Sequence, residues 1–143
     1  MSLKMSVAER EAFLADLHVG VLSLNDPGRG PLTAPVWYSY EPGGDIVVVT
    51  GESSRKGKLL SLGRRVSLCS QQEELPYKYV SVEGPVTSVE PTDVDATTRP
   101  MAQRYLGVEQ GNAYVEGDTG EGSITVRIRP ERWLTVDYAK SNG

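Results

Sequence analysis

The chain has 143 residues, of which 38% are hydrophobic and 24% charged, a composition typical of an ordinary globular protein with a buried core. Its formal net charge of −4 argues against nucleic acid as a partner, because nucleic-acid binding usually requires a broad basic surface. No apolar run approaches the roughly 18 residues of a transmembrane helix, so no membrane partner is expected, and the N-terminus lacks the apolar stretch of a signal peptide.

The single cysteine, Cys69, permits no internal disulfide and is typical of a protein of the reducing cytoplasm. With His18 as the only histidine a multi-histidine metal site is excluded, and no other residues have zinc-ligand spacing, so no metal is expected. No acid, base or nucleophile constellation stands out, and catalytic residues stay unassigned. We expect a single domain over residues 1–143, with residues 1–5 disordered or partly derived from an expression vector.

The first 51 residues predict one helix followed by three strands. Ser6 and Glu9 have the spacing of a capping box, and the apolar residues that follow share one helical face, which predicts a helix over 6–16. Alternating apolar residues bounded by Gly, Pro, Asn and Asp then indicate strands joined by hairpin turns. These strands are expected at 18–24, 32–40 and 45–51.

The remainder of the chain predicts two more helices and further strands. Gly84-Pro85 marks a bulge or an edge in the longest of these strands, and Pro91 opens a helix. The expected elements are a short helix at 53–62, strands at 64–70 and 77–89, a helix at 92–106, a Gly-rich acidic connection at 107–122, and strands at 123–129 and 133–138. Six or seven mostly antiparallel strands with three helices predict a small β-barrel with peripheral helices.

One segment is basic in an otherwise acidic chain. Residues 53–72 contain no acidic residue, and without their five positive charges the remainder has a net charge of −9, from 10 basic and 19 acidic residues. The basic residues are Arg55, Lys56, Lys58, Arg64 and Arg65. The segment starts where a strand gives way to a helix, and helix starts bind anions through free backbone N–H groups. It therefore predicts a phosphate site whose occupant is a small-molecule cofactor.

Four motifs, in this order and spacing, resemble the FMN-binding split β-barrel superfamily of pyridoxamine 5'-phosphate oxidase. They are Thr33–Tyr38, Thr50–Lys56, Arg65–Leu68 and Tyr77–Gly84. Within the superfamily the chain is most similar to the small actinobacterial reductases that depend on the deazaflavin F420. The resemblance implies a split β-barrel of six to seven strands and a homodimer with two cofactors in clefts at the subunit interface.

The resemblance also implies which residues bind the cofactor. The strand at 35–38 would flank the flavin-type ring, residues 50–56 would hold the phosphate, and Lys58, where the family often has Asn, would reach further anionic groups. The cofactor-binding candidates are Pro35, Val36, Trp37, Tyr38, Thr50, Gly51, Ser54, Arg55, Lys56, Lys58, Tyr77 and Tyr79. Because neighbours on a strand point to opposite faces, one of Trp37 and Tyr38 is expected inside the barrel. Arg64 and Arg65 are expected to be charges near a helix end.

The function expected from the resemblance is hydride transfer from F420 to a small organic acceptor. The acidic tail of F420 would favour extra cations such as Lys58, whereas an FMN-dependent oxidoreductase of the same fold is the alternative. A non-catalytic flavin or deazaflavin carrier and a structural dimer with an acidic partner also remain open. The segment 107–122 is a candidate lid.

Overall fold

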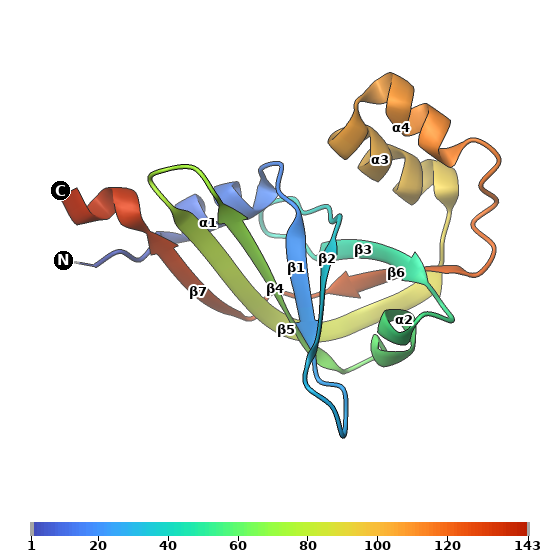
Figure 1. Cartoon of the computed structure of the whole chain (residues 1–143), viewed down its shortest axis with the longest axis horizontal. Coiled ribbons are helices and arrows are strands. Elements are labelled where there is room, and N and C mark those ends of the chain that lie inside the picture. The colour runs from blue at the N-terminus through green and yellow to red at the C-terminus, as the bar shows by residue number, and fades with distance from the viewer. Residues whose placement is uncertain (1, 143) are drawn as a thin grey trace.

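The computed structural model describes residues 2–142, which form a curved antiparallel sheet with helices at its margins (Figure 1). In chain order the elements are α1 (Val7–Ala15), β1 (Gly20–Leu24), β2 (Leu32–Val36), β3 (Ile46–Gly51), α2 (Arg55–Leu59), β4 (Arg65–Gln72), β5 (Lys78–Pro91), a π-helical turn (Val94–Thr98), α3 (Arg99–Leu106), α4 (Val108–Val115), β6 (Ser123–Ile128), β7 (Arg132–Asp137) and a final 3-10 turn (Tyr138–Asn142). The predicted capping box at the start of α1 is present.

The N-terminal residues 2–5 lie beside β7, in place of the disorder expected for residues 1–5. The carbonyl oxygen of Leu3 accepts a hydrogen bond of 2.8 Å from the Asp137 N–H, and the Met5 N–H donates one of 3.0 Å to Thr135 Oγ1. The Met5 side chain is buried in the core, which explains why the segment is held. Met1, included in the same expectation, lies outside the described residues.

The sheet confirms the predicted split β-barrel. Its strand order is β2-β1-β4-β5-β6-β3, with β7 also paired to β5, and every pair is antiparallel. The long strand β5 joins the two halves, because its first part pairs with β4 and β7 and its last part with β6. The irregularity expected at Gly84-Pro85 lies slightly further on, between Val86 and Ser88.

Gly84 marks instead a close approach between two chain segments. A Cβ atom at this position would lie 1.7 Å from the carbonyl oxygen of Arg129. The N–H of Arg129 donates to the Pro85 carbonyl (3.1 Å), and the N–H of Glu131 to the Glu83 carbonyl (2.9 Å). The connection from β6 to β7 can therefore cross β5 only because residue 84 has no side chain.

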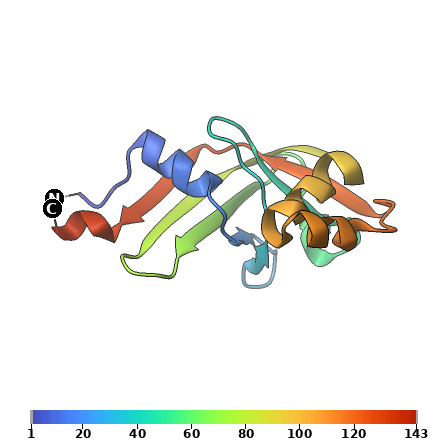
Figure 2. The same ribbon diagram turned by 90° about the horizontal axis from the view of Figure 1, so that it is seen from above.

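The core fills the inner face of the sheet. Leu22, Leu68 and Val82 lie in one register row across β1, β4 and β5, and all three are buried. Helix α1 lies along one side of the sheet (Figure 2), and its buried residues Phe13 and Leu14 belong to this core. The alternation of buried and half-buried residues along these strands is the pattern that the sequence predicts.

The expected Gly-rich acidic connection at 107–122 contains a helix, α4, so that the prediction of three helices was wrong. Gly111 and Val115 of α4 are buried and four residues apart, a helical spacing that the surrounding glycines conceal in the sequence. Helices α3 and α4 form a hairpin at one end of the sheet (Figures 1 and 2). Within residues 2–142 no helix has the length and apolar character to cross a membrane.

Candidate functional site

Helix α2 is fixed directly against the end of β3. The Ser54 hydroxyl accepts a hydrogen bond from the Gly57 N–H (3.0 Å) and donates one to the Gly51 carbonyl (2.7 Å). A Cβ atom on Gly57 would lie 2.0 Å from that same carbonyl oxygen. The absence of a side chain at Gly57 therefore allows α2 to pack on the strand end. The Thr50 hydroxyl lies 3.5 Å from Ser54 Oγ, at the same corner.

Four of the predicted site residues border one cavity of about 240 Å³. Pro35, Val36 and Trp37 come from β2 and the residue after it, and Lys56 comes from α2. The remaining lining residues are Val49, Thr98, Met101 and Tyr114. We call this cavity the Trp37 cleft. It combines a flat aromatic and aliphatic wall with one lysine, which is a suitable surface for a planar ring carrying an anionic group.

Trp37 forms the centre of an aromatic cluster between the barrel and the α3–α4 hairpin. Its indole stacks on Tyr105, with ring centroids 5.1 Å apart, and lies 5.2 Å from the ring of Tyr114 in a tilted arrangement. The Tyr105 hydroxyl donates to the His18 carbonyl (2.6 Å) and accepts from the Tyr38 N–H (3.1 Å). This cluster fixes one wall of the Trp37 cleft.

Tyr38, a predicted cofactor-binding residue, lies inside the barrel and does not line the cleft. Its side chain is completely buried, and its hydroxyl donates to the Leu14 carbonyl (2.7 Å) and lies 3.1 Å from Ser70 Oγ. Burial raises the pKa of Tyr38 to about 12. The alternation of buried and half-buried residues continues past the end of β2, so that Tyr38 is buried and Trp37 is half-buried.

The Arg55 side chain does not line the Trp37 cleft and forms an ion pair with Asp26 instead. Its Nε donates to Asp26 Oδ2 (3.2 Å), and its Nη2 contacts Asp26 Oδ1. Asp26 is only 4% exposed, and the Arg55 guanidinium holds the pKa of that carboxyl below its ordinary value. The ion pair ties α2 to the turn after β1, so Arg55 positions the helix. Asp26 was not predicted, because it lies 29 residues away in the sequence.

Two further arginines of the basic segment are engaged elsewhere. Arg65 contacts Glu131 (2.7 Å) and Glu83 (3.5 Å), and Arg64 donates to the Asn25 carbonyl (3.1 Å). Lys56 and Lys58 have no ion pair within 4.0 Å in the part of the chain that the structure describes. Lys56 is half-buried at the Trp37 cleft, whereas Lys58 is exposed and does not line it.

Tyr77 and Tyr79 lie at the far end of the sheet from α2. Tyr79 pairs with Gln71 of β4 and Val136 of β7, and Tyr77 precedes β5 and is exposed. Figures 1 and 2 both show the β4–β5 connection remote from α2. Within one chain, therefore, the structure does not bring these two tyrosines to the other predicted site residues.

The α3–α4 hairpin contributes cleft residues that the sequence interpretation did not assign. Met101 lies in the predicted helix 92–106, which was not assigned to the site, and Tyr114 lies in the expected connection 107–122. No pattern in the sequence assigned Thr98 or Val49 to a site. Their place in the cleft follows from the hairpin lying over β3, which is a tertiary feature.

The surroundings of His18 and Cys69 do not favour a catalytic role for either side chain. Burial lowers the pKa of His18, which stacks on Phe13 at 4.5 Å, and burial raises the pKa of the Cys69 thiol, which disfavours the thiolate. Among residues 2–142 no group of three His, Cys, Asp or Glu side chains is placed to hold a metal ion.

Comparison with known proteins shows the family. Residues 6–137 match the family described as pyridoxamine 5'-phosphate oxidase. The chain belongs to this family. The matched range spans nearly the whole chain and includes the residues that line the Trp37 cleft. No curated protein sequence matches the chain significantly.

Solved structures share the pyridoxamine 5'-phosphate oxidase fold. The chain is similar to an F420 reductase, at 19% identity and a TM-score of 0.71 over 87% of this chain and 94% of the other. It is similar to a conserved hypothetical protein from Mycobacterium tuberculosis, at 23% identity and a TM-score of 0.74 over 99% and 90%. A FAD-binding protein from Mesorhizobium loti gives 18% identity and a TM-score of 0.65 over 92% and 94%. At these identities the likeness shows the fold.

Proposed function

We propose that the protein is a cytoplasmic oxidoreductase that binds the deazaflavin F420 in the Trp37 cleft and transfers hydride to a small organic acceptor. The observation that carries the proposal is the meeting of the Pro35–Trp37 wall with Lys56 at one cavity. The similarity in fold to an F420 reductase and the family match support it. When bound, F420 would supply the hydride chemistry, and the protein would supply binding and orientation.

The residues present fit a planar cofactor with a phosphate. Val49, Met101 and the indole of Trp37 form an apolar slot, while Pro35, which has no N–H, lies on the edge strand β2 and interrupts its hydrogen-bonding capacity. Lys56 offers an ammonium group without an ion-pair partner among the described residues. We assign the phosphate contact to Lys56, with the Thr50 and Ser54 hydroxyls at the same corner.

Arg55 supports this phosphate contact without making it. Its guanidinium is held by the buried Asp26, and this pair fixes α2 and with it the position of Lys56. Lys58, two residues after Lys56 on α2, is exposed. An acidic tail leaving the phosphate would meet Lys58, which favours F420 over FMN, since FMN ends in its phosphate.

We also propose that the protein is a homodimer. On the outer face of the sheet Val21, Cys69, Ser81 and Leu134 lie in one register row across β1, β4, β5 and β7. None of them is charged, and Leu134 is 61% exposed. An uncharged row on an acidic protein is a suitable interface. A second chain packed there would also give Tyr77 and Tyr79 a route to the partner's cleft.

Fluorescence titration of the purified protein with F420 and with FMN tests the cofactor assignment. We expect F420 to bind more tightly than FMN, and Lys56→Gln to weaken F420 binding by about 1.5–3 kcal/mol through loss of a charge-assisted contact. Lys4→Gln, at an exposed lysine outside the cleft, serves as the control and should bind as the wild type does. Tighter binding of FMN would favour the FMN-dependent alternative, and binding of neither at tens of micromolar would overturn the proposal.

Turnover separates an enzyme from a carrier. Reduced F420 should be oxidised by a quinone, an enone or a tetrapyrrole only when the protein is present. The return of the absorbance of oxidised deazaflavin measures this oxidation. Tight binding of F420 without oxidation by any of these acceptors would identify a carrier.

A further inference from the structure

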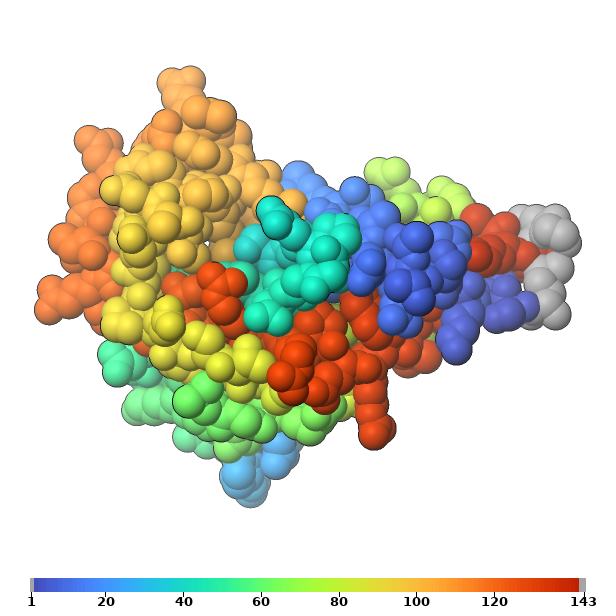
Figure 3. All heavy atoms as spheres, turned by 180° about the vertical axis from the view of Figure 1, so that it is seen from behind, coloured from blue at the N-terminus to red at the C-terminus, as the bar shows by residue number. Residues whose placement is uncertain are grey.

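A second cavity, of about 510 Å³, adjoins the Trp37 cleft on the same face of β3. Ser39, Val47 and Arg127 form its floor, since Ser39 pairs with Val47 and Val47 with Arg127 in one row. Met101 lines both cavities, and Val47 and Val49 are two residues apart on one face of the strand. We call this second cavity the Arg127 cavity. Figure 3 shows α3, the segment 39–45 and β6 meeting around it at the surface.

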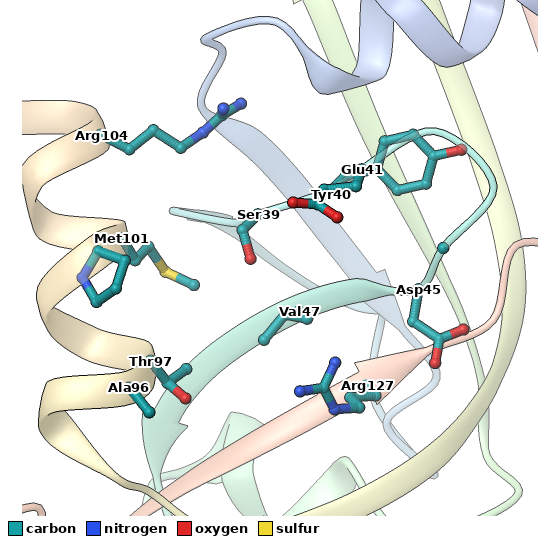
Figure 4. A pocket seen from close by; sticks show the side chains of 12 residues that line it. Ser39, Tyr40, Glu41, Asp45, Val47, Ala96, Thr97, Met101, Arg104 and Arg127 are labelled. Carbon is teal, nitrogen blue, oxygen red and sulfur yellow. The ribbon is translucent and has the colours of Figure 1, made fainter.

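Two arginines with unused hydrogen-bond donors border the Arg127 cavity. The guanidinium of Arg127 has no ion pair within 4.0 Å among residues 2–142, and in Figure 4 it points toward α3 and away from Asp45. Arg104 donates through Nη2 to two carbonyl oxygens at the end of α1, but its Nε is buried without a partner within the described chain. The carboxylates of Glu41 and Asp45 stand at the same cavity and balance the formal charge.

The order of groups along β3 indicates what the Arg127 cavity receives. Lys56 lies at the Thr50 end of the strand, Val49 follows beneath the Trp37 cleft, and Val47 and Arg127 lie further on. If the phosphate is at Lys56, then the ring lies over Val49, and the Arg127 cavity is on the side of the ring opposite to the phosphate. The tail of F420 is attached through the phosphate, so it would begin at the Lys56 end and not at this cavity.

We propose that the Arg127 cavity binds the hydride acceptor, and that this acceptor is an unsaturated molecule carrying a carboxylate. The inference rests on the proposed function, because it places the acceptor beside the cofactor ring. Val47, Pro100 and Met101 provide apolar walls for the body of the acceptor. Arg127 binds its carboxylate, since a guanidinium matches a carboxylate with two parallel hydrogen bonds.

Fluorine NMR with para-fluorocinnamate, and with its neutral amide as the matched probe, tests this proposal. Both probes are titrated into the protein with and without F420. We expect the wild type to bind the acid more tightly than the amide, and Arg127→Gln to weaken binding of the acid about tenfold or more while leaving the amide unchanged. Arg132→Gln, at an exposed arginine of β7 outside the cavity, should leave both probes unchanged. Thermal unfolding followed by circular dichroism verifies that each variant is folded.

The outcomes separate the acceptor from the cofactor tail. Equal binding of the acid to wild type and Arg127→Gln overturns the proposal. The proposal is also overturned if Arg127→Gln lowers the affinity for F420 and leaves the affinity for the acid unchanged. That result would place the cofactor tail in the cavity. Lys56→Gln should weaken the binding of F420 and leave the binding of the acid unchanged. A failure of the proposed function would instead appear as no F420 binding to the wild type, with binding of the acid still measurable on the cofactor-free protein.

Discussion

The indole of Trp37 and the phenol ring of Tyr105 stack almost parallel, with 5° between their planes. The same tyrosine is bound through its hydroxyl to the Tyr38 N–H and the His18 carbonyl. A single residue of α3 therefore packs the cleft wall and also ties the α3–α4 hairpin to the barrel.

Replacement of Tyr105 by Phe should separate these two roles. The stack on Trp37 would remain, whereas the hydrogen bonds of the hydroxyl would be lost, so we expect the free energy of unfolding to fall by about 1–3 kcal/mol with cofactor affinity little changed. Tyr105→Leu should lose the stack as well and weaken cofactor binding. Urea denaturation and fluorescence titration measure the two effects. Wild-type stability of Tyr105→Phe would show that the hydroxyl does not anchor the hairpin.

Gly57→Ala should displace α2 from the end of β3. The added Cβ would lie 2.0 Å from the Gly51 carbonyl oxygen, a backbone atom that cannot rotate away. We expect a loss of about 1–3 kcal/mol in the free energy of unfolding and weaker cofactor binding through the shift of Lys56. Gly30→Ala is the matched control, because a Cβ there meets no heavy atom within 4 Å. Equal melting temperatures for the two variants would refute this close approach.

The fold could be predicted from the sequence largely because its signals are local. Strand alternation, turn residues and the capping box at Ser6 indicated the barrel and α1, and α2 was expected at the basic segment. The cleft was predictable only in part. Nothing near Arg55 in the sequence indicates that the distant Asp26 holds it, and the place of Tyr114 depends on a hairpin that folds back over β3. Helix α4 was not predicted because the segment is rich in glycine, which conceals the helical spacing of its buried residues.

Lys58 should distinguish F420 from FMN. It is exposed two residues after Lys56 on α2 and does not line the Trp37 cleft, so we expect only a ligand that extends past its phosphate to reach it. Lys58→Gln should therefore weaken F420 binding by about 0.5–1.5 kcal/mol, as expected for a partly exposed charge contact, and leave FMN binding unchanged. Titration of both ligands into both proteins measures the difference. An equal loss for the two ligands would instead place Lys58 at the phosphate.

The ion pair of Arg55 with Asp26 should make stability depend on pH at the acidic side. The pKa of Asp26 lies below its ordinary value of 3.8, chiefly because Arg55 donates hydrogen bonds to its carboxylate. The ionised carboxylate thus stabilises the fold at pH values above the unfolded pKa, and this contribution disappears as the pH falls through the lower folded value. Asp26→Asn should melt below the wild type near pH 7, and the gap should narrow toward pH 2. A gap that is constant with pH would show that the charge of Asp26 is not responsible.

Leu134 should report on the proposed dimer. It is exposed on the outer row formed with Ser81, Cys69 and Val21, and a charge there would have to be desolvated at an interface. Leu134→Glu should therefore shift the protein from dimer to monomer, measured by light scattering after size-exclusion chromatography. Val108→Glu is the control, because Val108 is similarly exposed but lies on α4, away from this face. Dimers that persist in Leu134→Glu, or dissociate equally in Val108→Glu, would rule out the outer row as the interface.

Because each chain carries its own Trp37 cleft, a folded monomer of Leu134→Glu that still binds the cofactor with reduced affinity would measure how much the partner contributes to the site.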